Sequence, residues 1–141
     1  MWAQRKRPGI SVKAVEILRN LSYDIRLVLV GPYKGRRDWM TVKSACPDEE
    51  LRELYSKALA LIHPSEWEGF PYAVLESQAC GTQVIIGPGV SDEALINGET
   101  SFNASSFNSE EYAEKLKALL DDRSLWEHMS REARKYARNF V

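Results

Sequence analysis

The feature of the sequence that most constrains its fold is an alternation of short apolar runs with amphipathic helical patterns. Apolar residues recur at helical spacing over about 9–21, and Pro8 suits the first turn of that helix because its missing N–H has no helical partner there. Short apolar runs follow at 25–30, 60–63 and 83–86, and their length favours buried strands. Parallel strands need helical crossovers, so the alternation predicts an α/β fold: a doubly wound parallel sheet with helices on both faces, in three layers.

The rest of the chain fits the same scheme. A helix is expected to begin after Pro47, where Asp48, Glu49 and Glu50 stabilise its first turn. The other expected elements are a short strand at 40–45, a helix over about 71–79, a short helix near 91–96, a strand at 101–103 and two C-terminal helices.

Length and charge bound the class of protein. With 141 residues the chain is expected to form one domain, residues 1–141, large enough to bury a full core. The formal net charge of -1 gives no indication of a nucleic-acid partner. No apolar run is long enough for a transmembrane segment and no signal peptide is evident, so we expect a cytoplasmic protein, free or peripheral at the cytoplasmic face of a membrane. Cys46 and Cys80 are expected to be reduced thiols.

The candidate chemistry lies in residues 64–81, PSEWEGFPYAVLESQACG, where Glu68 precedes a helix and Glu76 lies inside it. On one helix the two carboxylates would be about 12 Å apart along the axis, against about 5 Å in a retaining glycosidase, which weakens a glycosidase interpretation. Carboxylates accept hydrogen bonds from hydroxyls, so the pair suits two parts of one extended ligand with ribose or sugar groups. The N-terminus of the helix, with Gly69 allowing close approach, suits a diphosphate.

This stretch resembles the E-x7-E signature of retaining glycosyltransferases with the GT-B architecture, in the glycogen-synthase-like and mannosyltransferase-like group (group 1 glycosyltransferases). Further segments recur in family order over essentially the whole chain: 6–8, 28–31, 48–51, 74–76, 79–82, 97–100 and the paired C-terminal helices. The resemblance implies the Rossmann-like C-terminal half of that architecture, which binds the sugar donor.

The resemblance also implies a role for each matching residue. Glu76 would bind the ribose hydroxyls of a nucleotide-sugar donor, and Glu68 would face the transferred sugar near the reacting carbon. The backbone around Gly69 and Phe70 would hold the sugar and diphosphate, while Lys6 would be the lysine of a basic pair that neutralises the leaving diphosphate. The remaining expected donor-binding residues are Pro71, Arg7, Gly31 and Ser65.

The chain departs from the family pattern in two places. The family commonly has glycine at the position of Pro71, and proline has no N–H to offer a phosphate. The family's first strand, with the arginine of the basic pair, would lie at or before Met1. The resemblance implies an N-terminal acceptor domain that completes the active site, in cis or in trans.

We therefore expect the donor-binding domain of a retaining glycosyltransferase that moves a sugar from a nucleoside diphosphate sugar to an acceptor hydroxyl. No cofactor is expected, and no metal, because the sequence has no His/Asp cluster with metal-ligand spacing. The alternative function is a non-catalytic nucleotide-sugar-binding or assembly module. A flavodoxin-like receiver is disfavoured, because that fold's first strand and its acidic cluster are absent.

Several of these residues also have a purely structural interpretation. Glu76 could be a solvated helix residue, Glu68 a helix cap, and Lys6 with Arg7 an ordinary basic helix start. A packed structural role is favoured for His63, and a solvated loop is favoured for the basic residues Lys34, Arg36 and Arg37.

Overall fold

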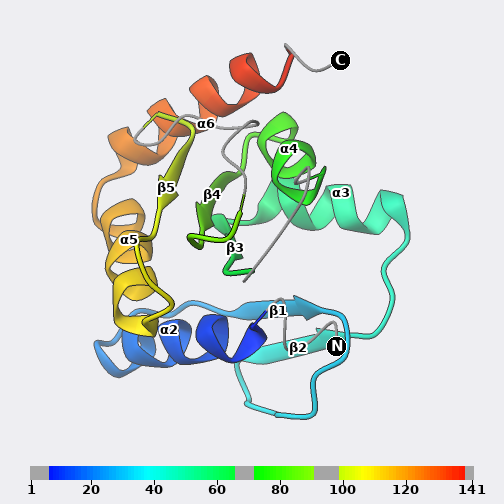
Figure 1. The fold of residues 1–141 in the computed structure, drawn as a ribbon, viewed down its shortest axis with the longest axis vertical. Helices are drawn as coiled ribbons and strands as arrows, with labels where there is room; N and C mark the ends of the chain where they lie inside the picture. The colour runs from blue at the N-terminus through cyan, green and yellow to red at the C-terminus, as the bar shows by residue number, and fades with distance from the viewer. Residues whose placement is uncertain (1–6, 66–71, 91–98, 139–141) are drawn as a thin grey trace.

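The structure is a computed structural model that describes residues 7–65, 72–90 and 99–138. In chain order, its elements are α2 (Pro8–Asn20), β1 (Leu27–Val30), β2 (Met40–Lys43), α3 (Asp48–Lys57), β3 (Ala60–His63), α4 (Tyr72–Ala79), β4 (Gln83–Ile86), β5 (Ser101–Asn103), α5 (Ser109–Asp121) and α6 (Arg123–Ala137) (Figure 1). Strands at 60–63, 83–86 and 101–103 are confirmed to the residue.

All strand pairs in the described part of the chain are parallel, as the sequence predicted. They form two hydrogen-bonded groups: a two-stranded sheet, β1–β2, and a three-stranded sheet in the order β3–β4–β5. Figure 1 shows the first sheet beside α2 and the second sheet between α4 and α5. The expected doubly wound α/β organisation is therefore present, with its strands in two hydrogen-bonded groups.

The strand orders within the two sheets are compatible with the common doubly wound order, 3-2-1-4-5-6. In that order β2 and β1 can correspond to positions 3 and 2, and β3, β4 and β5 can correspond to positions 4, 5 and 6. Among the described residues, no strand pairs with both β1 and β3.

The middle strand β4 shows how helices cover both faces of the larger sheet. Ile85 belongs to a core cluster formed with buried residues of α2 and α5, including Leu18 and Tyr112. Its neighbours Val84 and Ile86 point the other way, because side chains alternate along a strand, and cluster with Val74 of α4. The structure therefore has the three layers that the sequence predicted.

Two predicted strands are shorter in the structure. The run at 25–30 becomes a strand only from Leu27, whose N–H donates to the Trp39 carbonyl at 3.1 Å. The strand expected at 40–45 ends at Lys43, whose carbonyl accepts the Gly31 N–H at 2.8 Å. The apolar run continues beyond the residues that pair with the neighbouring strand, so the run predicts a strand longer than the one that forms. The short helix expected near 91–96 lies outside the described residues.

Cys46 and Cys80 are free thiols. Among the described residues, no helix is long and apolar enough to cross a membrane.

Candidate functional site

The carboxyl ends of β3, β4 and β5 lie side by side at one edge of the larger sheet. Parallel hydrogen bonds continue beyond the strands there: the Gly87 N–H donates to the His63 carbonyl at 3.1 Å, and the Ala104 N–H donates to the Ile86 carbonyl at 2.8 Å. In open α/β sheets ligands bind outside this edge. The residues after the three strands are therefore the natural place for a site.

Glu76, the fifth residue of α4, has an exposed side chain. Its charge acts on Tyr55 of α3: burial of the phenol and, next in size, the Glu76 carboxylate raise the pKa of Tyr55 to about 12. The carboxylate thus lies on the part of α4 that approaches α3, and its exposure leaves it accessible to a ligand.

Ser65 follows β3 and is fully buried. Its hydroxyl oxygen lies 3.4 Å from Nε2 of His63, the last residue of the strand. His63 is itself 8% exposed, which agrees with the packed role expected for it. This buried pair lies at the carboxyl end of β3.

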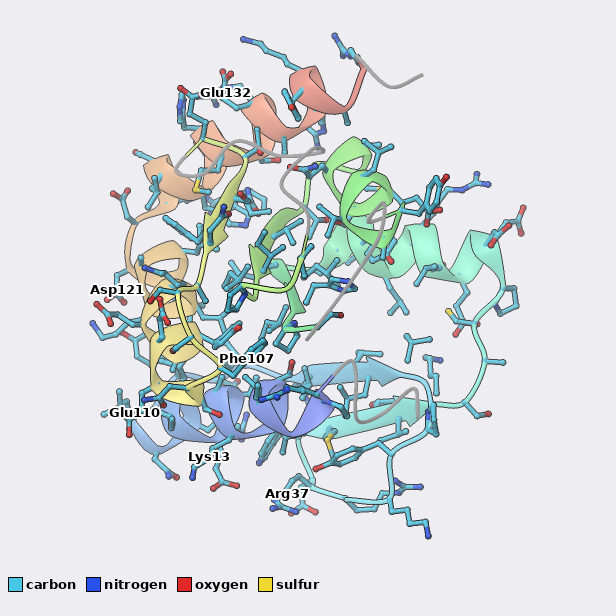
Figure 2. The ribbon with its side chains drawn as sticks, viewed as in Figure 1. Lys13, Arg37, Phe107, Glu110, Asp121 and Glu132 are labelled. Carbon is cyan, nitrogen blue, oxygen red and sulfur yellow. The ribbon has the colours of Figure 1, made fainter. Side chains whose placement is uncertain are left out.

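Arg7 lies immediately before α2, in a left-handed conformation with φ 47 and ψ 57. Its guanidinium carbon lies 4.1 Å from the centre of the Phe107 ring. Phe107 lies in the loop between β5 and α5 (Figure 2). The positive charge also reaches Tyr112. Burial, and then Glu111, raise the pKa of Tyr112 to about 12, and Arg7 opposes this rise.

Gly87, which follows β4, lies beside Tyr112, Phe107 and Pro64. A Cβ placed on it would lie 2.8 Å from the Tyr112 hydroxyl oxygen, 3.2 Å from a Phe107 ring carbon and 3.2 Å from the Pro64 Cα. A side chain at this position would therefore be crowded, which favours glycine. Phe107, the residue that Arg7 contacts, therefore lies beside Gly87 and Pro64 at the carboxyl edge of the larger sheet.

The loop that carries Phe107 is fixed by hydrogen bonds. The Glu111 carboxylate accepts the backbone N–H groups of Ser105, at 2.8 Å, and Ser106, at 3.0 Å, together with both serine hydroxyls. Burial alone raises the pKa of Glu111, but these bonds outweigh it, so the pKa lies below its ordinary value. The Tyr112 hydroxyl donates to the Ser106 carbonyl at 3.0 Å, and Asn108 caps α5.

Gly31 lies at the carboxyl end of β1, in the smaller sheet. Its φ of 125 is one that side chains rarely adopt, so glycine is needed there for conformation. The nearby basic loop behaves as a solvated loop: Arg36 and Arg37 are exposed, and each donates to loop carbonyls.

The structure gives the positions of some of the expected site residues and tests none of their roles. Ser65 follows β3, Arg7 precedes α2 and contacts Phe107, Glu76 lies on α4, and Gly31 lies at the end of β1. Five expected site residues lie outside the described residues, and their roles stay predictions: Lys6, Glu68, Gly69, Phe70 and Pro71.

Sequence reasoning missed Phe107, Gly87 and Tyr112. Phe107 and Tyr112 flank the helix cap Asn108 at the spacing of a hydrophobic staple, which predicts a local helix start. Nothing in that pattern points to Arg7, 100 residues earlier in the chain. Among residues 7–65, 72–90 and 99–138, no three His, Cys, Asp or Glu side chains gather as a metal site, and metal-independent transfer stays an expectation.

Together, the parallel strands, the helices on both faces and the polar residues at the carboxyl edge define a Rossmann-like α/β domain. The chain matches the family model for glycosyl transferases group 1 over residues 3–136, and it belongs to this family.

Its curated relatives are longer. The chain is 28% identical, over 152 aligned residues, to a D-inositol 3-phosphate glycosyltransferase from Arthrobacter sp. (strain FB24). That alignment covers 96% of this chain and 36% of the relative. The chain is also similar to an N-acetylgalactosaminyltransferase from Campylobacter jejuni that acts on N,N'-diacetylbacillosaminyl-diphospho-undecaprenol. That alignment is 33% identical over 89 residues and covers 60% of this chain and 23% of the relative. The chain thus spans about a third of the length of the first of these.

Solved structures confirm the fold. The C-terminal domain of a group 1 glycosyl transferase (LpcC) from Francisella tularensis has a TM-score of 0.84 at 17% identity, over 96% of this chain and 80% of that one. HepE from Anabaena, in complex with UDP and glucose, has a TM-score of 0.82 at 16% identity, over 96% of this chain and 41% of that one. The chain therefore has the C-terminal Rossmann-like fold of GT-B glycosyltransferases.

Proposed function

We propose that this chain is the donor-binding domain of a retaining glycosyltransferase, and that it binds a nucleoside diphosphate sugar at the carboxyl edge of β3–β4–β5. The sugar is transferred to an acceptor hydroxyl with its anomeric configuration kept. A second domain, in cis or in trans, supplies the acceptor. Membership of the glycosyltransferase family supports the reaction class.

The observation that carries the proposal is the position of Glu76. It is an exposed carboxylate in the second turn of α4, the helix that follows the carboxyl end of β3. A carboxylate accepts hydrogen bonds from two neighbouring hydroxyls at once, which suits a ribose. Glu76 holds the nucleoside end of the donor in this proposal, and Glu68 faces the sugar.

Arg7 also supports the proposal. Its guanidinium contacts Phe107, whose ring lies beside Gly87 at the carboxyl end of β4. A leaving nucleoside diphosphate carries at least two negative charges, and a positioned cation stabilises them as the bond to the sugar breaks. Arg7 and Lys6 form the basic pair in this proposal. HepE, which shares the fold, was solved with UDP and glucose, so the fold accommodates such a ligand.

Calorimetric titration of the chain with UDP, GDP and ADP tests the proposal. We expect saturable binding of one of these nucleotides. Glu76→Gln keeps the size of the side chain but removes its charge, and we expect it to weaken binding by about tenfold or more, the cost of losing hydrogen bonds to a charged group.

Glu114→Gln is the matched control. Glu114 is an exposed glutamate on α5, so the same substitution there changes the net charge equally. Its affinity should equal that of the wild-type chain. If none of the three nucleotides binds, or if Glu76→Gln binds as tightly as Glu114→Gln, the proposal is wrong.

Transfer is a separate measurement. With the remaining part of the glycosyltransferase present, the matching nucleotide sugar should be consumed in the presence of an acceptor, and nuclear magnetic resonance should show the product with the anomeric configuration of the donor. Nucleotide binding without any transfer would favour the alternative function, a non-catalytic nucleotide-sugar-binding module.

A further inference from the structure

Phe107 is the least expected residue at the candidate site. It lies in the loop between β5 and α5, beside α2 in Figure 2, and the Arg7 guanidinium carbon lies 4.1 Å from the centre of its ring. A ring carbon of Phe107 also lies next to Gly87, at the end of β4. One aromatic side chain thus joins the residue before α2 to the carboxyl edge of the larger sheet.

Hydrogen bonds hold the loop that carries Phe107, the residue that Arg7 contacts. Glu111 accepts both backbone N–H groups of Ser105 and Ser106, and Tyr112 donates to the Ser106 carbonyl. Asn108, the next residue after Phe107, accepts the Glu110 N–H at 3.1 Å and begins α5. Hydrogen bonds therefore hold the backbone on both sides of Phe107, and its ring packs beside Gly87.

We propose that Phe107 is a positioning residue that holds the Arg7 guanidinium where the diphosphate of the donor binds. The inference rests on the proposed function, because it assigns Phe107 a role in that same site.

Stacking suits this task for a physical reason. A guanidinium attracts the face of an aromatic ring through its own flat face, and its N–H donors lie in its plane. Stacking therefore restricts the tilt of the group and does not itself consume an N–H donor. Arg7 leads directly into α2 from a left-handed backbone conformation, so ring and backbone together define the direction of its side chain.

A purely structural role for Phe107 is the competing explanation. Phe107 and Tyr112 have the spacing of a hydrophobic staple, which stabilises the start of a helix. In that case Phe107 variants would lower stability and would change nucleotide affinity only through disturbance of the site as a whole, with or without Arg7. The two explanations differ in whether the effect on binding depends on Arg7.

The first experiment compares Phe107→Leu, which removes the aromatic face, with Phe107→Tyr, which keeps it. Binding of UDP, GDP and ADP is measured by calorimetry at low ionic strength. We expect Phe107→Leu to weaken the nucleotide that binds the wild-type chain by about two- to fivefold, the usual strength of an exposed cation–π contact. Phe107→Tyr should retain wild-type affinity.

Phe102→Leu is the matched control. Phe102 is a partly buried residue of β5 that packs against the core, and its ring has a lysine, Lys115, 6.0 Å from its centre. The variant should lose stability and bind the nucleotide normally. If Phe102→Leu weakens binding as much as Phe107→Leu, a general loss of packing explains both, and the inference is overturned.

The decisive readout is a double-mutant cycle with Arg7→Gln. If Phe107 acts through Arg7, then Phe107→Leu will cause no further loss of affinity once Arg7 is replaced. An equal loss in both backgrounds would overturn the inference. The Arg7 side-chain Nε–H resonance adds a test without ligand, because it should lie upfield in the wild-type chain and in Phe107→Tyr, and should move downfield in Phe107→Leu.

These readouts separate the inference from the proposed function. Wild-type binding that Phe107→Leu leaves unchanged overturns the inference alone. A wild-type chain that binds none of the three nucleotides overturns the proposed function, and the positioning role in that site is overturned with it.

Discussion

The two parallel sheets have similar apolar strands but very different surroundings. In the larger sheet, Val84 and Ile85 of β4 are fully buried, whereas Val28 of β1 in the smaller sheet is 41% exposed. β4 is hydrogen-bonded on both edges and covered by helices on both faces. Among the described residues, β1 is hydrogen-bonded only to β2. Burial therefore depends on how many elements surround a strand, and much less on the apolar character of the strand itself.

The largest expected effect tests this comparison with the same substitution in each sheet. Val84→Ala leaves a hole where no solvent reaches, and we expect it to lower the free energy of unfolding by about 2 to 3 kcal/mol. Val28→Ala removes a half-exposed side chain and should cost about 0.5 kcal/mol. Urea denaturation followed by circular dichroism measures both values.

The slopes of the urea transitions provide the control. Both variants should keep the wild-type slope, since neither substitution changes the surface exposed on unfolding. Equal losses of stability at the two positions would show that β1 is as well packed as β4, and the contrast between the sheets would be wrong.

The next effect concerns the glycines at the ends of β1 and β4. Gly87→Ala should cost about 1 to 2 kcal/mol, because the new methyl group meets the Tyr112 hydroxyl, a Phe107 ring carbon and the Pro64 backbone. Gly31→Ala should also destabilise, but through its φ of 125. Denaturation of both variants measures the two costs.

The two mechanisms separate when Tyr112→Phe is added. This change removes the oxygen that lies 2.8 Å from a Cβ at Gly87, so part of the Gly87→Ala cost should be recovered. Gly31→Ala should gain nothing from it. If Tyr112→Phe affects the two glycine variants alike, crowding is not the reason for glycine at position 87.

The sequence predicts the strands and helices well, because the local pattern of apolar and turn residues agrees with the elements that form. Runs such as 60–63 and 83–86 are bounded by turn residues and match β3 and β4 to the residue. The separation of the strands into two sheets was not predicted. Hydrogen-bonded pairing joins residues far apart in the chain, and no local pattern reports which strand edges meet.

Some residues of the candidate site could likewise be predicted from the sequence, and others could not. Ser65 and Glu76 could be named from a contiguous motif, and Arg7 from a separate segment, 6–8, that follows the family pattern. Phe107 could not, because its contact with Arg7 joins residues 100 positions apart and leaves no periodic signal. Gly87 is similar: only the folded structure shows that Tyr112 fills the space that a side chain would need.

A smaller effect concerns the loop after β5, which Glu111 fixes, and its dependence on pH. Burial raises the pKa of Glu111, but hydrogen bonds from Ser105 and Ser106 lower it more, so the folded-state pKa lies below the ordinary value of 4.5. The stabilisation is therefore fully present above about pH 5 and is lost as the pH falls through the folded-state pKa. Glu111→Gln should lower stability by about 1 kcal/mol at pH 7.

Denaturation at a series of pH values checks the sign. The difference between the wild-type chain and Glu111→Gln should shrink as the pH falls below 4.5, because protonation removes the same charge. Glu114→Gln, an exposed change on the same helix, should show a smaller difference at pH 7. A difference for Glu111→Gln that grows towards acid pH would contradict the assignment.

The smallest expected effect lies in the loop after β1. Arg37 joins this loop to α2 through Glu16, with 3.5 Å between Nε and the carboxylate oxygen, and both side chains are close to half exposed. Solvent and salt screen such a pair, so Arg37→Ala should change the free energy of unfolding by less than about 0.5 kcal/mol.

Amide hydrogen exchange is the sharper measurement, because it reports each sheet separately. The amides of β1 and β2 should exchange faster than those of β4 in the wild-type chain, since local opening of a two-stranded sheet breaks fewer contacts. Arg37→Ala should speed exchange in the smaller sheet and leave β4 unchanged. Uniform protection across both sheets would show that they unfold as one unit.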